Sequence, residues 1–122
     1  FPGGASGGIL PANLASLPLD FGVFEEYGGF IGSHAIVILS DHDNIKEAAL
    51  NTMRFFKHES CGQCTPCRSG TDKMISLLED NNKELDLYNA LIKVMSDSSI
   101  CGLGQAASNC VSHLIKYFPE EF

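Results

Sequence analysis

Three cysteines occur within seven residues, in the run Cys61-Gly-Gln-Cys64-Thr-Pro-Cys67, and a fourth, Cys101, begins the sequence Cys-Gly-Leu-Gly. The spacing of two residues between cysteines directs three sulfur atoms of one loop toward a common point, and one remote thiolate then completes a set of four. Such ligation is typical of a cubane [4Fe–4S] cluster. Structural zinc sites more often take their ligands as two close pairs. We therefore predict an iron–sulfur cluster, with a structural zinc-binding interaction module as the alternative.

The size and charge of the chain restrict its class further. Its 122 residues fit one domain, and a net charge of −7 argues against nucleic acid and anionic membrane surfaces as partners. The longest apolar run, residues 35–39, is too short to cross a bilayer, so no direct membrane insertion is expected. Five cysteines, four of them with metal-ligand spacing, indicate a reducing, cytoplasmic compartment. The chain begins with Phe1 instead of Met, which suggests a fragment of a longer protein.

The hydrophobic pattern divides the chain into two parts. Residues 1–42 are rich in Gly and Pro and are expected to be mostly loop, with a short helix near 20–27 and a buried strand at 35–39 whose partner strands lie upstream. From residue 43 the apolar residues recur with helical period. The fold class is therefore mainly α, with a four-helix bundle over residues 43–122. The predicted helices cover about 43–57, 65–78, 83–96 and 105–118, and a loop over 98–104 presents Cys101.

The start of the second predicted helix gives one of the cysteines a reason to be a thiolate. Thr65 and Pro66 are typical of an N-cap and a first helical residue. Cys67 would then lie in the first turn, where unpaired backbone N–H groups and the helix dipole favour negative charge.

Glycines and basic residues accompany the cysteines. Glycines beside the sulfur atoms allow backbone N–H groups to approach inorganic sulfide, and these glycines are Gly62, Gly102 and Gly104. Between residues 54 and 73, four basic residues stand against two acidic ones, in a chain that is acidic as a whole. This local excess suits an anionic cluster, and Arg68 is the basic residue closest to the cysteines. An equally good interpretation is that these side chains are ordinary solvated charges on helix surfaces.

Two other chemistries fit the motifs less well. The pair Cys61 and Cys64 resembles the CxxC of thiol–disulfide oxidoreductases, but a predicted helix and not a strand precedes it, and a third cysteine follows at the same spacing. The glycines in residues 3–8 invite a phosphate-loop interpretation, but no Gly-Lys-Ser/Thr ending follows them.

The remaining cysteine and the histidines are expected to be structural or exposed. Cys110 lies on the apolar stripe of the last predicted helix and is expected to be a small core residue instead of a ligand. His58 is close to the cysteine loop and is either a substitute ligand or, more simply, a surface histidine at a helix end. The other histidines are expected at the surface or in turns, and they are His34, His42 and His113.

Two longer strings resemble a known family. They are Glu59-Ser-Cys-Gly-Gln-Cys-Thr-Pro-Cys-Arg-Ser-Gly70 and Ser99-Ile-Cys-Gly-Leu-Gly-Gln-Ala-Ala107. Together they resemble the cluster-binding part of NADH-dehydrogenase-type flavoprotein subunits, a family found in respiratory complex I, NAD-reducing hydrogenases and NAD-dependent formate dehydrogenases. The form Cys-Gly-Leu-Gly-Gln-Ala, with Ile115-Lys-Tyr-Phe-Pro119, is most similar to the formate dehydrogenase β branch. The segment Gly3-Gly-Ala-Ser-Gly-Gly-Ile-Leu-Pro11 resembles the end of the family's β-grasp segment, which residues 1–42 would represent.

The resemblance implies a function. Cys61, Cys64, Cys67 and Cys101 would ligate one [4Fe–4S] cluster, which exchanges electrons with FMN and NAD(H) bound by a domain upstream of this chain. The chain alone is then expected to carry electrons between that domain and other redox subunits of an oxidoreductase, without catalytic activity of its own.

Overall fold

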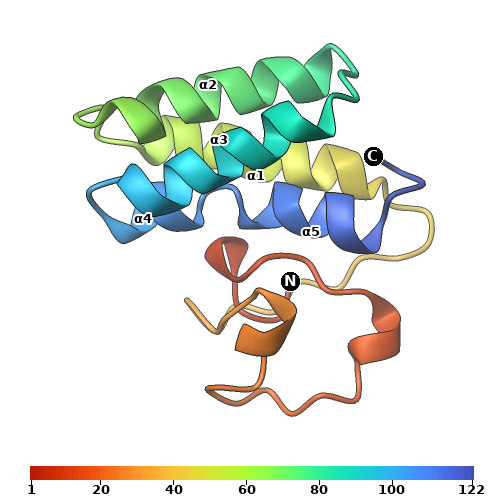
Figure 1. The fold of residues 1–122 in the computed structure, drawn as a ribbon. Helices are drawn as coiled ribbons and strands as arrows, with labels where there is room; N and C mark the ends of the chain where they lie inside the picture. Colours follow the sequence, from red (N-terminus) through yellow and green to blue (C-terminus); the bar gives the residue numbers. More distant parts are fainter.

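The computed structural model describes all residues, 1–122, and consists of helices and loops without a β-strand (Figure 1). The α-helices pack together as a bundle, and residues 1–44 lie along one side of it (Figure 1). The helices are α1 (Ile45–Glu59), α2 (Thr65–Glu79), α3 (Leu85–Ser98), α4 (Gly102–Ala106) and α5 (Asn109–Tyr117), and the 3-10 turns are Ala5–Gly7, Ala12–Leu14 and Glu25–Tyr27.

Helix α1 illustrates why these segments are helical. Asn44 caps it, because the Asn44 Oδ1 atom accepts a hydrogen bond from the backbone N–H of Glu47 at 2.8 Å. Side chains at helical spacing, among them Ala49, Met53 and Phe56, are buried on one face of α1. The first three predicted helices are confirmed, each with ends within about two residues of those expected from the pattern.

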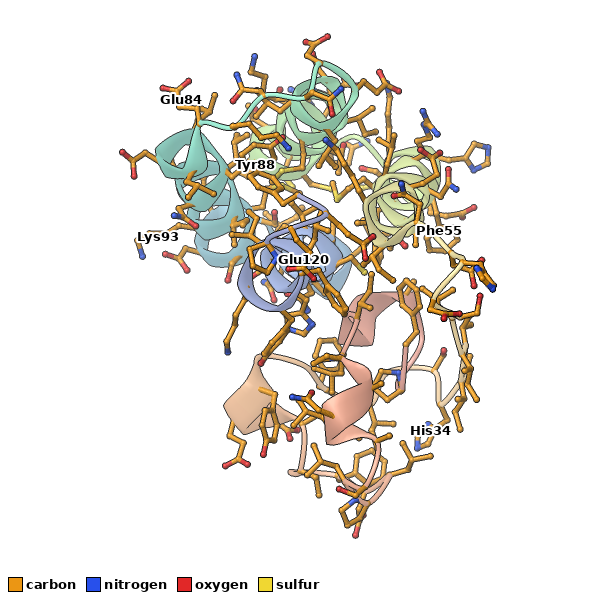
Figure 2. All side chains as sticks on the ribbon, turned by 90° about the vertical axis from the view of Figure 1, so that its right-hand side faces the viewer. His34, Phe55, Glu84, Tyr88, Lys93 and Glu120 are labelled. Atoms are coloured by element: carbon orange, nitrogen blue, oxygen red, sulfur yellow. The ribbon has the colours of Figure 1, made fainter.

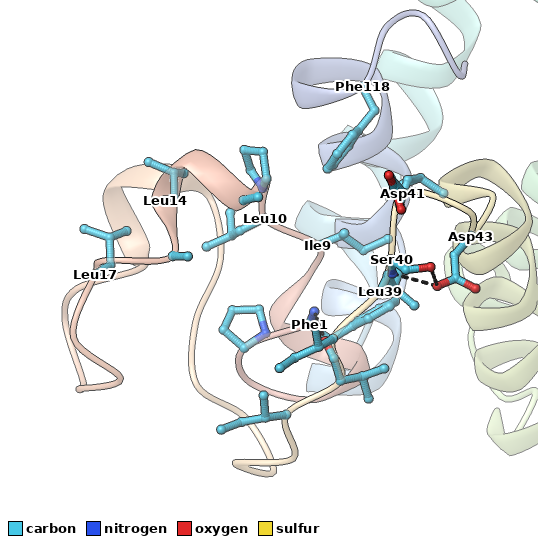
Figure 3. A pocket seen from close by; sticks show the side chains of 18 of the residues that line it. Phe1, Ile9, Leu10, Leu14, Leu17, Leu39, Ser40, Asp41, Asp43 and Phe118 are labelled. Carbon is cyan, nitrogen blue, oxygen red and sulfur yellow. Dashed lines mark hydrogen bonds between the residues drawn. The ribbon is translucent and has the colours of Figure 1, made fainter.

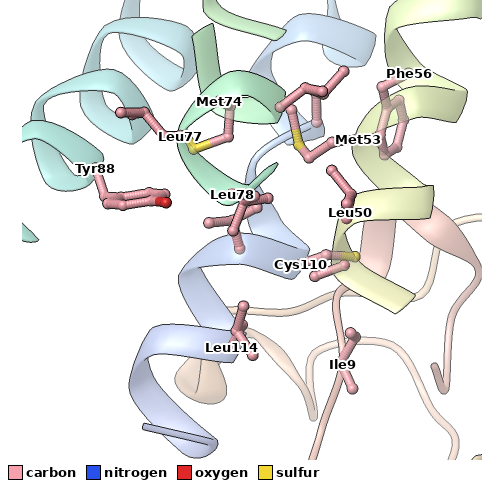
Figure 4. Close-up of a cluster of buried hydrophobic side chains, with 14 of the residues drawn as sticks. Ile9, Leu50, Met53, Phe56, Met74, Leu77, Leu78, Tyr88, Cys110 and Leu114 are labelled. Atoms are coloured by element: carbon pink, nitrogen blue, oxygen red, sulfur yellow. The ribbon is translucent and has the colours of Figure 1, made fainter. Parts of the chain in front are cut away.

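The core lies between the helices and is built mainly of Leu, Ile and Met side chains (Figure 4). Tyr88 is fully buried and points into the bundle, whereas Glu84 and Lys93 of the same region point outward (Figure 2). The Tyr88 hydroxyl donates to the backbone carbonyl of Asn82 at 3.3 Å, which satisfies its polar end. This core exists without any contribution from the cysteine loop, so the bundle has its own source of stability.

The last predicted helix is two helices. The pattern over 105–118 predicted one element, but the helix is interrupted at Ala107 and Ser108, and Gly102 to Gly104 are helical instead of loop. The interruption lets α4 pack against α2 and α3 while α5 packs against α1.

The predicted strand at 35–39 was wrong. Ile38 is 90% exposed, and the segment is extended but unassigned to any sheet. Its backbone pairs only with the first residues: Phe1 and Val37 exchange N–H···O bonds of 2.9 and 3.0 Å, and the Gly4 N–H donates to the Ala35 carbonyl at 2.8 Å. The apolar, β-branched composition therefore indicates a preference for backbone pairing. In this structure only the first residues of the chain lie alongside residues 35–39 to pair with them.

The N-terminal segment is held to α5 by side chains that bind its backbone. Asn109 Nδ2 donates to the Ser6 carbonyl at 2.8 Å, and the Tyr117 hydroxyl donates to the Tyr27 carbonyl at 2.7 Å. A Cβ atom on Gly7 would lie 2.3 Å from the Phe30 carbonyl oxygen, so this glycine allows two backbones to touch. The short helix expected near residues 20–27 is only the 3-10 turn Glu25–Tyr27.

An apolar hollow of about 540 Å³ lies where residues 1–44 meet the end of α5 (Figure 3). Ile9, Leu14, Leu39 and Phe118 are among the side chains that line it. None of the cysteines does so, and the hollow is therefore separate from the cysteine loops. No helix of the protein has both the length and the apolarity needed to cross a membrane.

Candidate metal centre

The two cysteine loops lie at the same end of the bundle, on the left in Figure 1, although they are far apart in the sequence. One loop joins α1 to α2, and the other joins α3 to α4. The helices that follow the two loops pack closely, because a Cβ atom placed on Gly104 of α4 would lie only 2.8 Å from the Cβ atom of Cys67 in α2. The packing of α4 on α2 thus brings Cys101 to the end of the bundle that carries the cysteine triplet.

Two of the cysteines stand at helix N-termini. Cys64 immediately precedes α2 and Cys101 immediately precedes α4, and neither helix has a side-chain hydrogen bond at its cap. The predicted cap, Thr65, is instead the first residue of α2. Cys67 lies in the first turn, as predicted, and is buried. Cys61 and Cys101 are exposed, so the site opens to solvent on one side.

Backbone donors from both loops face Cys64. The N–H group of Ile100, from the second loop, is the main cause of a lowered pKa of the Cys64 thiol, and the N–H group of Cys67 contributes next. The Ser99 hydroxyl also contributes to the lowered pKa. The assembled loops therefore stabilise a thiolate at Cys64, which is the form that binds iron.

Glycines shape the site in different ways. Gly62 has a φ of 71°, a left-handed conformation that favours glycine. Gly104 is required by close approach, since a Cβ atom there would also lie 2.5 Å from Ser99 Oγ. A Cβ atom on Gly62 or Gly102 would meet no other atom within 4 Å, so both positions border open space beside the cysteines.

Arg68 contacts the cysteine loop itself. Its Nη1 atom donates to the Gly62 carbonyl at 2.5 Å, and its Nη2 atom donates to Thr65 Oγ1 at 3.3 Å. Arg68 therefore fixes the conformation of the loop that carries the triplet.

The other nearby basic residues are mostly engaged elsewhere. Arg54 bonds to Glu79 at 2.8 Å and Lys57 pairs with Asp72, so both link α1 to α2 on the exposed surface. Such exposed pairs contribute little to stability. The interpretation as ordinary helix charges is the better one for Arg54 and Lys57.

Cys110 and His58 lie outside the site. Cys110 is fully buried, its thiol donates to the Ala5 carbonyl at 3.4 Å, and burial raises its pKa to about 12, as befits a core residue (Figure 4). His58 is an exposed histidine in the last turn of α1, bonded to Glu59 at 3.1 Å.

The expectation that His113 is a surface residue was wrong. It is only 2% exposed and is enclosed by glycine backbone, so that a Cβ atom on Gly8 would lie 2.3 Å from its Nδ1 atom. Its position three residues after the buried Cys110 is the helical spacing that places both on one face of α5, a signal that the sequence contained.

The four thiols of the two loops are the kind of donor set that a [4Fe–4S] cluster takes. As the side chains stand, no group of three or more His, Cys, Asp or Glu residues could hold a single metal ion. The open space beside Gly62 and Gly102 and the donors facing Cys64 supply room and thiolate stabilisation.

Two serines at the site were not predicted from the sequence. The Ser60 hydroxyl lies 3.3 Å from Cys67 Sγ, and the Ser99 hydroxyl is among the groups facing Cys64. Their only signal in the sequence is that each stands within two residues of a cysteine.

Comparison with known proteins shows that this chain is similar to one part of several longer proteins. Residues 47–122 match the iron–sulfur binding region of NADH-ubiquinone oxidoreductase-F. The corresponding NADH-quinone oxidoreductase subunit of Rickettsia typhi is 36% identical over 98% of this chain and 30% of its own length, and that of Rhodobacter capsulatus is 35% identical over the same shares. A crystal structure of an NAD+-reducing [NiFe]-hydrogenase in the H2-reduced state superposes with a TM-score of 0.86, at 29% identity, over 99% of this chain and 22% of that one.

The chain therefore belongs to the family of NADH-dehydrogenase-type flavoprotein subunits, as its iron–sulfur-binding region. The cofactor of this region is a [4Fe–4S] cluster, which confirms the iron–sulfur prediction over the zinc alternative. The chain spans about a third of the length of the curated relatives it matches.

Proposed function

We propose that this chain is the electron-relay module of an NAD-linked oxidoreductase. The observation that carries the proposal is the meeting of two cysteine loops at one end of the bundle, where backbone N–H groups from both loops stabilise the Cys64 thiolate. When bound there, a [4Fe–4S] cluster accepts and returns one electron without making or breaking a bond to a substrate.

The roles of the residues follow from their positions. We assign Cys61, Cys64, Cys67 and Cys101 as the four ligands. Arg68 holds the triplet loop through its bonds to Gly62 and Thr65. Close packing at Gly104, together with the space beside Gly62 and Gly102, lets the second loop and the cluster approach the triplet. The exposed side, at Cys61 and Cys101, is the exit for electrons toward a partner.

The partners belong to the proposal too. The relatives are named as subunits of NADH-quinone oxidoreductases and a NAD+-reducing hydrogenase. We infer that FMN and NAD(H) are bound by another part of the same subunit, and that a further redox subunit receives the electron, in the cytoplasm. Residues 1–42 would connect the two parts as the end of a β-grasp segment, and 43–122 would form the cluster-binding unit. The strings around Cys101 and Pro119 favour a formate dehydrogenase as the complex, a finer assignment that co-purification with a molybdenum- or tungsten-containing subunit would test.

Reduction of the purified chain tests the relay directly. Dithionite should bleach the cluster with one electron per chain, whereas NADH alone should not reduce it. In the complete subunit, NADH should bleach the same chromophore. A cluster that takes no electron from dithionite would contradict the relay function, and NADH reduction of this chain alone would contradict the assignment of FMN and NAD(H) to another part.

A further inference from the structure

Two serine hydroxyl groups lie against the sulfur atoms of the site. Ser60 follows the last residue of α1, and its Oγ atom is 3.3 Å from Cys67 Sγ. The same Oγ atom accepts a hydrogen bond from the Gly62 N–H at 3.1 Å. A hydroxyl has one proton to donate. The Gly62 N–H uses an acceptor position of the oxygen and leaves the Ser60 proton available for Cys67. Once Cys67 is a thiolate, its sulfur has no proton to donate and can only accept a hydrogen bond.

Ser99 is the corresponding residue of the second loop. Its Oγ atom is buried and has no hydrogen-bond partner of good geometry, although buried polar groups are nearly always paired. The hydroxyl lies where the two loops meet, because a Cβ atom on Gly104 would be 2.5 Å from Ser99 Oγ and 2.8 Å from the Cβ atom of Cys67. The backbone of Ser99 is fixed by a 3.0 Å bond from Gln105 Nε2 to its carbonyl. A fixed, buried and unpaired donor beside a proposed ligand is expected to find its acceptor when that ligand is a metal-bound thiolate.

We propose that Ser60 and Ser99 donate hydrogen bonds to the sulfur atoms of Cys67 and Cys64 and thereby raise the reduction potential of the bound cluster. The inference rests on the proposed function, because it requires those cysteines to be ligands. A donor to a ligand sulfur withdraws electron density and stabilises the more negative, reduced state more than the oxidised state. One electron enters on reduction, and the serine protons remain on their oxygens.

The test is potentiometry of the cluster-loaded protein, purified anaerobically and followed by its visible absorbance. The variants are Ser60→Ala and Ser99→Ala, and Ser60→Thr retains the hydroxyl. Ser108→Ala is the matched control, because Ser108 Oγ is also buried and unpaired but lies between α4 and α5. At the midpoint potential of the unsubstituted protein, each of the two alanine variants should show a ratio of reduced to oxidised cluster at least threefold lower, about 28 mV at 59 mV per tenfold. Ser60→Thr and Ser108→Ala should leave the ratio unchanged.

The outcomes separate the inference from the proposed function. Alanine variants that keep a full complement of iron and sulfide at an unchanged potential would overturn the tuning role. If an alanine variant loses its cluster, the Ser→Gly variant at the same position is measured instead. Loss of the cluster from both variants would show that the serine has a structural role and does not tune the potential. An unsubstituted protein without a reducible iron–sulfur chromophore would contradict the proposed function itself, before any variant is compared.

Discussion

The four proposed ligands differ in how the chain supplies them, and Cys101 is the one that stands alone. Replacing Cys101 by Ala leaves the triplet loop intact but removes the closing thiolate. We expect Cys101→Ala to lose most of its iron and sulfide while its far-UV circular dichroism remains helical, because the core does not depend on this residue. Unchanged iron and sulfide would show that another side chain is the fourth ligand.

Cys110 supplies the matched comparison, since the same substitution there removes a thiol from the core. Cys110→Ala should keep full iron and sulfide and lower the free energy of unfolding by about 1 kcal/mol, for the small volume lost and the bond to Ala5. Urea unfolding together with metal analysis measures both quantities. Loss of the cluster from Cys110→Ala but not from Cys101→Ala would reverse our ligand assignment.

At the scale of elements, the contact of α4 with α2 determines whether the two loops meet. Gly104→Ala should lower the free energy of unfolding by about 1–3 kcal/mol despite the better helix propensity of alanine, because the new methyl group would overlap Ser99 and Cys67 close to the backbone. Gly102→Ala, in the same helix, meets no atom within 4 Å and serves as the control. Urea unfolding of the metal-free variants makes the comparison, and equal stabilities would mean that α4 does not pack on Cys67 as described.

The elements also show what the sequence could and could not predict. The period of apolar residues located α1, α2 and α3, because these helices each bury one face against the others. The same pattern missed the interruption at Ala107 and Ser108, because it depends on tertiary packing: both segments contact α3, but α4 also contacts α2 whereas α5 contacts α1. The strand at 35–39 failed for a related reason, since composition reports a preference for pairing but not the presence of neighbours.

At the site, the spacing of the cysteines is the basis of the proposed ligand set, because thiolate ligands of a cluster follow a regular pattern in a short loop. It did not locate the N–H group of Ile100 or the hydroxyl of Ser99, whose role depends on how the second loop meets the first. Arg68 was found only as a nearby charge, whereas the structure shows it bonded to loop carbonyls.

At the scale of the whole molecule, His113 joins the bundle to the N-terminal segment. Burial lowers its pKa, and the nearby charge of Lys116 acts in the same direction, while backbone groups of Gly28 and Ile9 oppose this. Because the pKa of His113 is lower in the folded protein than in the unfolded chain, neutral His113 is compatible with full stability above the unfolded-state pKa of about 6.5. As the pH falls below that value, the unfolded chain binds the proton more readily and the free energy of unfolding decreases.

We therefore expect the free energy of unfolding of the metal-free protein to fall between pH 7 and pH 5, by at most about 1.4 kcal/mol per pH unit from this residue. His113→Gln should flatten that slope, whatever its effect on absolute stability. His42→Gln, which removes a histidine at a highly exposed position, is the matched control. A slope that is the same in His113→Gln would show that other groups cause the pH dependence.

The central claim for the whole molecule is that its four clustered cysteines hold a [4Fe–4S] cluster, and metal and sulfide analysis with an optical spectrum tests it most directly. Protein purified anaerobically should be brown, contain about four iron atoms and four sulfides per chain, and bleach on reduction. A colourless protein with one zinc ion per chain and no sulfide would contradict the account.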